Sequence, residues 1–206
     1  MKKKLYLFDM DGTLLDSMHV WSDIDKRFLS KHHITAPDDF SEKIASMTLP
    51  ECADYFIELG VKKSKDDIIS GFIKDVEEEY RLHIPLIPGM DEVLKKLHSE
   101  GHTICLITSS ERSYIIPALK RLNIYDYFTE VYTSTELGMN KRSGDIYKKL
   151  CDMHGFSPED TVVYEDALFA INSAKNAGCH VVAVYGSDSR DNFEDIADIA
   201  DEIYRY

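Results

Sequence analysis

The sequence has few cysteines, a shortage of basic residues and no apolar stretch long enough to cross a membrane. Its four cysteines lie far apart and form no Cys-x-x-Cys pair, which argues against disulfides and against a zinc site. Lysine and arginine total 24 against 37 acidic residues, so the formal net charge is -13. Because nucleic-acid binding needs basic patches, we expect no nucleic-acid partner, and we expect no membrane association.

We expect no targeting segment. The sequence begins Met-Lys-Lys-Lys, like a signal peptide, but Asp9 and Asp11 interrupt the apolar region that such a peptide needs. We therefore expect a cytoplasmic protein, and a monomer, since no pattern indicates an obligate interface. The 206 residues suffice for one large domain or for one domain carrying an insert.

The most informative stretch is the apolar run Leu5-Tyr6-Leu7-Phe8, which stops at Asp9 and Asp11. The run is typical of a buried strand, and ligands bind at the carboxyl ends of strands in parallel α/β sheets. Two close carboxylates repel, so they need a shared proton or a cation. A hard divalent cation such as Mg²⁺, which prefers oxygen ligands, satisfies this need.

From residue 88 onward, predicted strands alternate with predicted helices. This alternation indicates βαβ units and a parallel sheet covered on both faces. Right-handed connections then bring the ends of the strands that precede Asp9, Thr108 and Asp166 to one edge of the sheet. The sequence therefore predicts that chemistry-bearing residues from distant segments converge there.

Residues 17–87 show helical patterns without a strand pattern. Trp21, Ile24 and Phe28 have helical spacing. A later helix, opening at Ser64, places Ile69, Phe72, Ile73, Val76 and Tyr80 on one apolar face. We predict a helical cap domain over 17–87, a catalytic core over 1–16 and 88–206, and two linkers, at 14–17 and 84–89.

The string Phe-Asp-x-Asp-Gly-Thr-Leu-x-Asp-Ser at residues 8–17 resembles the first motif of the haloacid dehalogenase superfamily. Thr108 and Ser109, then Lys141, then Glu165 and Asp166 follow in the order of its other motifs. The resemblance implies an α/β fold with a Rossmann-like core, a parallel five-stranded sheet of order 5-4-1-2-3, and a helical cap inserted after the first strand. It also places the chain in the β-phosphoglucomutase-like phosphatase subgroup. One departure is that the third motif, often Lys-Pro-x-Pro, here reads Lys-Arg-Ser-Gly.

The resemblance also implies residue roles. Asp9 would be the nucleophile that forms an aspartyl-phosphate, and Asp11 the general acid and base. Mg²⁺ would bind the Asp9 side chain, the Asp11 backbone carbonyl and the Asp166 side chain. Thr108, Ser109 and Lys141 would bind the substrate phosphate. Glu165 would be either a direct metal ligand or, as we favour, a residue that supports the metal ligands from outside.

Three functions remain open at this stage. The first is a Mg²⁺-dependent phosphatase acting on a small phosphorylated metabolite, such as a sugar or polyol phosphate. The second is a sugar phosphomutase resembling β-phosphoglucomutase, although Trp21 stands where such mutases place a histidine and the stretch 46–49 lacks their cap arginine. The third is a phosphate-accepting switch such as a receiver domain, which is much shorter and has no helical insert.

Overall fold

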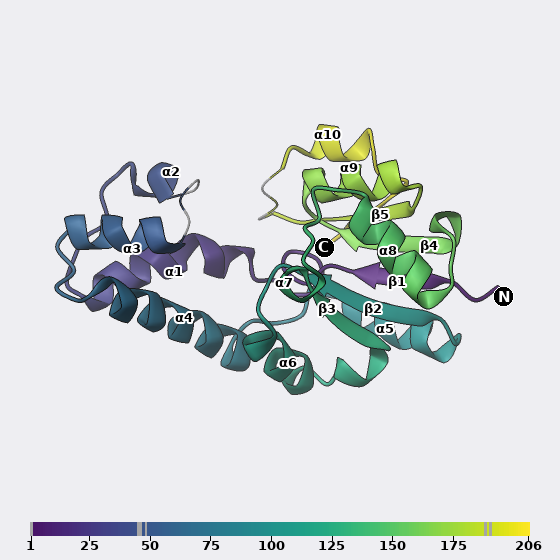
Figure 1. Cartoon of the computed structure of the whole chain (residues 1–206), viewed down its shortest axis with the longest axis horizontal. Helices are drawn as coiled ribbons and strands as arrows, with labels where there is room; N and C mark the ends of the chain where they lie inside the picture. The colour runs from purple at the N-terminus through teal and green to yellow at the C-terminus, as the bar shows by residue number, and fades with distance from the viewer. Residues whose placement is uncertain (1, 45–46, 48, 188, 190) are drawn as a thin grey trace.

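A computed structural model describes residues 2–44, 47, 49–187, 189 and 191–206, and its centre is one parallel sheet (Figure 1). The strand order is β3-β2-β1-β4-β5-β6, which confirms the predicted order 5-4-1-2-3. The prediction of five strands was wrong, because a sixth strand near the carboxyl terminus pairs with β5. The strands are β1 (Leu5–Phe8), β2 (Thr103–Thr108), β3 (Glu130–Thr133), β4 (Thr161–Glu165), β5 (His180–Tyr185) and β6 (Glu202–Arg205).

The register of the central strands positions the site. Phe8, the last residue of β1, lies level with Leu106 of β2 and with Tyr164 of β4. The segments that follow these three strands therefore meet at the carboxyl edge of the sheet. The backbone N–H of Asp9 extends the ladder by donating to the Tyr164 carbonyl at 2.9 Å.

Two layers of helices cover the sheet, and they build two apolar clusters. One face packs against α8 (Asp145–His154), α9 (Leu168–Ala177) and α10 (Phe193–Ala197). The other face packs against α5 (Met90–Ser99) and α6 (Arg112–Arg121). Side chains alternate along β1, so Leu7 belongs to the first cluster and Phe8 to the second. A short helix, α7 (Ser134–Leu137), follows β3.

The segment between β1 and β2 begins with four helices that extend away from the sheet, at the left of Figure 1. They are α1 (Met18–Lys31), α2 (Phe40–Ile44), α3 (Leu49–Glu58) and α4 (Lys65–Leu82), and no strand lies in the described part of 18–82. The helical character predicted for 17–87 is thus confirmed up to Leu82, while the domain boundaries themselves stay a prediction. The Trp21 side chain and residues 46 and 48 lie outside the described part of the chain.

The buried stripe of α4 differs from the predicted one. Its fully or nearly buried residues are Ile68, Phe72, Val76 and Tyr80, four residues apart, whereas Ile73 is 40% exposed. Contact with the α1 ring of Phe28, whose centroid is 6.1 Å from that of Phe72, turns this row inward. The prediction that Ile73 lies on the buried face was therefore wrong, because the buried row runs through its neighbour Phe72 instead.

The two predicted linkers lie side by side. The N–H of Asp16 donates to the Pro85 carbonyl at 3.1 Å, and the N–H of Ile87 donates to the Leu14 carbonyl at 2.8 Å. Arg121 of α6 donates to backbone carbonyls at the end of α4, as a basic residue can at a helix carboxyl terminus. The helices α1–α4 are consequently tied to the sheet where the chain leaves it and where it returns.

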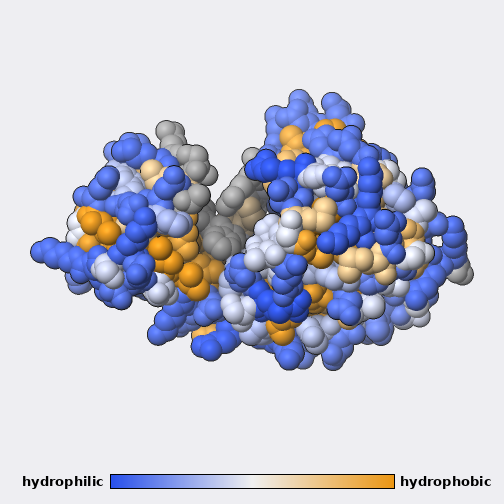
Figure 2. All heavy atoms as spheres, in the orientation of Figure 1, coloured by the Kyte–Doolittle hydropathy of each residue, from blue (hydrophilic) through white to orange (hydrophobic). Residues whose placement is uncertain are grey.

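The surface agrees with the acidic, polar composition. Hydrophilic side chains predominate on the face in Figure 2, and apolar ones form scattered patches. Within the described residues, no helix combines the length and the apolar character needed to cross a bilayer.

Candidate active site

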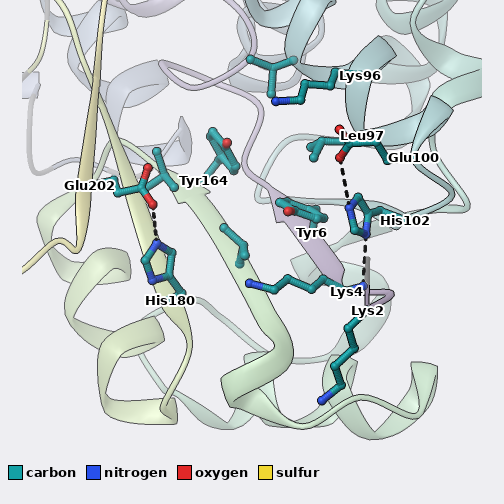
Figure 3. A pocket seen from close by; sticks show the side chains of 13 residues that line it. Lys2, Lys4, Tyr6, Lys96, Leu97, Glu100, His102, Tyr164, His180 and Glu202 are labelled. Atoms are coloured by element: carbon teal, nitrogen blue, oxygen red, sulfur yellow. Dashed lines mark hydrogen bonds and ion pairs between the residues drawn. The ribbon is translucent and has the colours of Figure 1, made fainter.

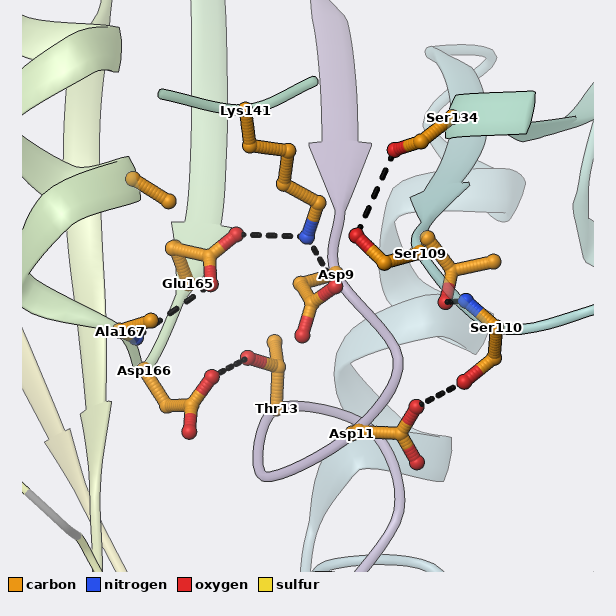
Figure 4. Close-up of polar contacts among 12 residues, drawn as sticks. Asp9, Asp11, Thr13, Ser109, Ser110, Ser134, Lys141, Glu165, Asp166 and Ala167 are labelled. Carbon is orange, nitrogen blue, oxygen red and sulfur yellow. Dashed lines mark hydrogen bonds and ion pairs between the residues drawn. The ribbon is translucent and has the colours of Figure 1, made fainter. Parts of the chain in front are cut away.

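Asp9 and Lys141 form the buried centre of the site, and each side chain is at most 7% exposed. Lys141 lies in the loop between α7 and α8, far from Asp9 in sequence, and its ammonium group donates to Asp9 Oδ1. It also donates to Glu165 Oε2 at 2.9 Å, so one cation bridges two carboxylates (Figure 4). The structure therefore brings together three predicted residues from three separate segments.

Asp166 lies beside this group, directly after β4. Oxygens of Asp9, Glu165 and Asp166 all lie within 4.8 Å of one another, close enough to hold one metal ion. Gly12 makes room for Asp166, because a Cβ at Gly12 would lie 2.3 Å from Asp166 Oδ2. Gly12 also has a φ of +79°, which side-chain-bearing residues rarely adopt, so this position needs glycine.

The electrostatics of this cluster favour a divalent cation. Burial raises the pKa of Asp9 to about 8, with Glu165 adding to the rise and Lys141 opposing it. Burial also raises the pKa of Asp166, and the charges of Glu165 and Asp9 raise it further. Burial would lower the pKa of Lys141, but Asp9 and Glu165 raise it instead. Three carboxylates against one ammonium group leave two negative charges unbalanced, and their oxygens are ligands that suit Mg²⁺.

Glu165 is the most constrained carboxylate of the cluster. One of its oxygens accepts from Lys141, and the other accepts from the N–H of Ala167 at 3.3 Å. Both oxygens therefore have donors already, which suits a residue that positions Lys141. Its predicted place behind the metal ligands stays a prediction.

Asp11 faces different partners. Its Oδ1 accepts from Ser17 Oγ at 2.7 Å and from the Tyr80 hydroxyl, and its Oδ2 accepts from Ser110 Oγ at 2.6 Å. In Figure 4 its side chain turns away from Lys141 toward Ser110. The Asp11 side chain is not part of the acidic cluster, which agrees with a role in proton transfer.

Thr108 and Ser109 end β2 and begin the loop beside Asp9. Thr108 is almost fully buried, and its hydroxyl accepts from the Ser110 N–H at 3.0 Å. Ser109 Oγ lies 3.4 Å from Ser134 Oγ at the start of α7. Their predicted part in binding phosphate stays a prediction.

Sequence reasoning missed several hydrogen-bond partners of Asp11 and Asp166. Tyr80 was assigned only to an apolar helix face, yet its hydroxyl bonds Asp11. Thr13 Oγ1 lies 3.5 Å from Asp166 Oδ1, and Ser110 bonds Asp11. A tyrosine ending an apolar stripe was the available signal, because a buried tyrosine hydroxyl usually finds a partner.

Comparison with known proteins agrees with this arrangement. A family model described as haloacid dehalogenase-like hydrolase matches residues 6–184. The chain is 28% identical to a phosphorylated carbohydrates phosphatase of Thermotoga maritima over 184 residues, covering 87% of this chain and 83% of that protein. It is 26% identical to a β-phosphoglucomutase of Bacillus subtilis over 189 residues, covering 88% and 83% of the two chains.

The fold has a close counterpart among solved structures. The crystal structure of a putative β-phosphoglucomutase from Thermotoga maritima matches with a TM-score of 0.85 and 22% identity, covering 98% of this chain and 94% of that one. At this identity the match supports the fold alone. Because the family model spans most of the chain and includes every motif described above, the protein belongs to the haloacid dehalogenase-like hydrolases.

Proposed function

We propose that the protein is a Mg²⁺-dependent phosphatase that hydrolyses a small phosphate monoester through an aspartyl-phosphate on Asp9. The observation that carries the proposal is the buried contact between Asp9 and Lys141, beside Asp166 and apart from the Asp11 side chain. This arrangement separates a nucleophile held by a cation from a second carboxylate suited to moving protons. A phosphorylated carbohydrate is the substrate class that the Thermotoga relative's name supports.

In the first half-reaction, a carboxylate oxygen of Asp9 attacks phosphorus. The bond between Asp9 and phosphorus forms as the ester P–O bond breaks, and Asp11 gives its proton to the leaving alkoxide. In the second half-reaction, Asp11 takes a proton from water, and the water oxygen attacks phosphorus as the bond between Asp9 and phosphorus breaks, which releases inorganic phosphate. Asp9 and Asp11 then return to their starting protonation states.

Charge neutralisation is the main physical demand of the first step. A carboxylate and a phosphate charge about 4 Å apart repel by about 4 kcal/mol at an effective dielectric constant near 20. Lys141 brings one positive charge to Asp9, and Glu165 keeps the ammonium group in place. Thr108, Ser109 and nearby backbone N–H groups would donate to the phosphoryl oxygens.

The residues present suit a bound Mg²⁺. Asp9 and Asp166 would hold it through side-chain oxygens, and Asp11 through its backbone carbonyl. When bound, the ion would neutralise negative charge on the carboxylates and on the transferring phosphoryl group. Gly12 and Thr13 keep Asp166 in position for this role, the first by leaving space and the second through its hydroxyl.

A sugar phosphomutase is the second candidate, favoured by the similarity to the Bacillus enzyme. A mutase would use the same core and return the phosphoryl group to a second hydroxyl of the sugar. The receiver-like switch is disfavoured, because the chain belongs to a hydrolase family and carries four helices between β1 and β2.

The test is phosphate release from a panel of small phosphate monoesters, with Mg²⁺ and with EDTA, for the parent protein and Asp9→Asn. The panel includes β-glucose 1-phosphate, coupled to detection of glucose 6-phosphate. We expect Mg²⁺-dependent phosphate release that Asp9→Asn abolishes, while the control Asp195→Asn, an exposed carboxylate on α10, keeps it. Glucose 6-phosphate formed without net phosphate release would establish the mutase, and near-normal turnover by Asp9→Asn would refute the mechanism.

A further inference from the structure

A cavity lies toward the amino ends of the strands, away from Asp9. Its volume is about 510 Å³, within the range of about 300–1,000 Å³ typical of small-molecule sites. It opens where β1, β2, β5 and β6 begin, beside α5, whereas the catalytic groups follow the ends of β1 and β4. The proposed phosphatase chemistry does not use this cavity.

The floor of the cavity is apolar and aromatic. Val162 and Val182 are buried, and the half-buried rings of Tyr6 and Tyr164 lie beside them. Tyr164 is held firmly, because its ring stacks on Phe8 with centroids 4.4 Å apart. A rigid apolar floor of this kind suits a flat hydrophobic body.

The acidic groups around the cavity are already engaged. Glu202 Oε1 lies 2.9 Å from His180 Nε2, and Glu100 Oε2 lies 3.3 Å from His102 Nε2 (Figure 3). His102 Nδ1 accepts the N–H of Lys4 at 3.1 Å, so its proton sits on Nε2 and points toward Glu100. Two carboxylates therefore have donors before any ligand arrives.

The basic groups are engaged less completely. Lys2 pairs with Asp160 at 2.5 Å. Lys4 and Lys96 also line the cavity, and across the described part of the chain their ammonium groups have no ion pair or hydrogen bond. In Figure 3 the Lys4 side chain reaches across the cavity on the side of His180. In a protein of net charge -13, two ammonium groups without partners beside an apolar floor are complementary to an anion.

From these features we propose that this cavity, the amino-edge pocket, binds a small organic anion with a flat apolar body. The body would lie on Tyr6, Tyr164 and the two valines, and the anionic group would accept hydrogen bonds from Lys4 and Lys96. The pocket is separate from the catalytic site, so the proposal stands whether or not the phosphatase assignment does.

The test uses 1-anilinonaphthalene-8-sulfonate (ANS), an aromatic sulfonate that is not a phosphate ester, with the whole protein. Calorimetric and fluorescence titrations are expected to give one site with a dissociation constant on the order of tens of micromolar, typical for a ligand of this size. Naphthalene-1-methanol has the flat apolar body but no anionic group, and inorganic sulfate is an anion without an apolar body. We expect each of them to bind at least about tenfold more weakly than ANS.

Matched lysine variants locate the site. Lys4→Gln and Lys96→Gln remove ammonium groups that line the pocket, while Lys3→Gln and Lys95→Gln remove exposed neighbours that do not. All four change the net charge equally. We expect the dissociation constant of ANS to rise about fivefold in each pocket variant, to rise further in the double variant, and to stay unchanged in both controls. Hydrogen exchange should show ANS protecting residues 93–102 and leaving α4 unchanged.

Three results would overturn the proposal. The first is no ANS binding at millimolar concentration. The second is binding that the pocket variants and the controls weaken alike, which would place the probe elsewhere. The third is a concentration-dependent dimer that Lys4→Gln and Lys96→Gln abolish while ANS binding stays unchanged, which would assign the surface to a second copy of the chain.

Discussion

Asp9 and Asp11 are two residues apart, yet their surroundings are opposite in kind. The Asp9 side chain is buried among charges, with the Lys141 ammonium group bonded to it and two further carboxylates nearby. The Asp11 side chain is surrounded by hydroxyl groups, three of which donate to it. Although only one residue separates them, the two side chains lie in two regions of different chemistry.

The difference teaches which task each region can perform. A carboxylate beside an ammonium group and a candidate metal site can attack phosphorus in its charged form, which these cations favour against the burial that raises its pKa. A carboxylate that hydroxyl groups hold in place, apart from the ammonium group and the acidic cluster, is positioned to exchange a proton with the leaving group or with water. The two regions also differ in origin, because every partner of Asp9 belongs to the sheet and its loops, whereas Tyr80 belongs to α4.

Asp11→Asn tests the proton-transfer half of the comparison and has the largest expected effect. The amide keeps the shape of the side chain but cannot donate a proton to an alkoxide, so kcat should fall by about 10³-fold or more. The Mg²⁺ concentration for half-maximal activity should stay unchanged, because the side chain is outside the acidic cluster. Steady-state rates across a Mg²⁺ titration measure both, with Asp195→Asn as the control. A variant that turns over normally would remove Asp11 from the mechanism.

Lys141→Met tests the charged half. It leaves the Asp9 and Glu165 carboxylates without their shared cation, and we expect kcat to fall by about 10²- to 10³-fold. The metal-free variant should also unfold at a lower temperature than the parent, because an unpaired buried charge is costly. Phosphate release and thermal denaturation check the two effects, and Lys148→Met, an exposed lysine of α8, is the control. Unchanged kcat would mean that Lys141 has only a structural part.

Asp166→Asn sharpens the comparison by weakening the metal site alone. It removes one anionic oxygen from the acidic cluster, so half-maximal activity should require about tenfold to hundredfold more Mg²⁺. High Mg²⁺ should restore much of the parent kcat, which it should not do for Asp11→Asn. Activity titrations measure this against Asp195→Asn, an exposed carboxylate on α10. An unchanged Mg²⁺ requirement would refute the ligand role of Asp166.

The sequence predicted the sheet well, because its strands are short apolar runs separated by helices. The stretches 5–8 and 161–164 are apolar runs typical of buried strands, and the resemblance to the haloacid dehalogenase superfamily implied the order of the strands. The sixth strand, Glu202–Arg205, mixes charged and apolar residues, and it depends on pairing with β5 and on long-range contacts such as that of the Tyr204 hydroxyl with the Pro88 carbonyl. The rotation of α4 that exposes Ile73 depends on packing against α1, and periodicity alone does not specify it to one residue.

The sequence predicted the groups around Asp9 but not all of those around Asp11. The groups around Asp9 stand at strand ends or in a short loop, so topology places them together. The hydroxyls around Asp11 come from residues 17, 80 and 110, and no local pattern links Tyr80 at the end of a cap helix with a loop after β1. Long-range contacts of this kind arise from packing between elements, which the sequence pattern does not encode position by position.

Tyr80→Phe tests the link between the helices and Asp11, and it has the smallest expected effect. The substitution keeps the ring that packs against Tyr114, with centroids 4.7 Å apart, and removes only the hydroxyl that donates to Asp11. Ser17 and Ser110 continue to hold the carboxylate, so kcat should fall by only about threefold to tenfold, with KM and the Mg²⁺ requirement unchanged. Steady-state kinetics beside the parent protein measure the contribution of the Tyr80 hydroxyl. A loss as large as that of Asp11→Asn would mean that α4 controls proton transfer directly, and no loss at all would mean that the region around Asp11 is complete without the helical segment.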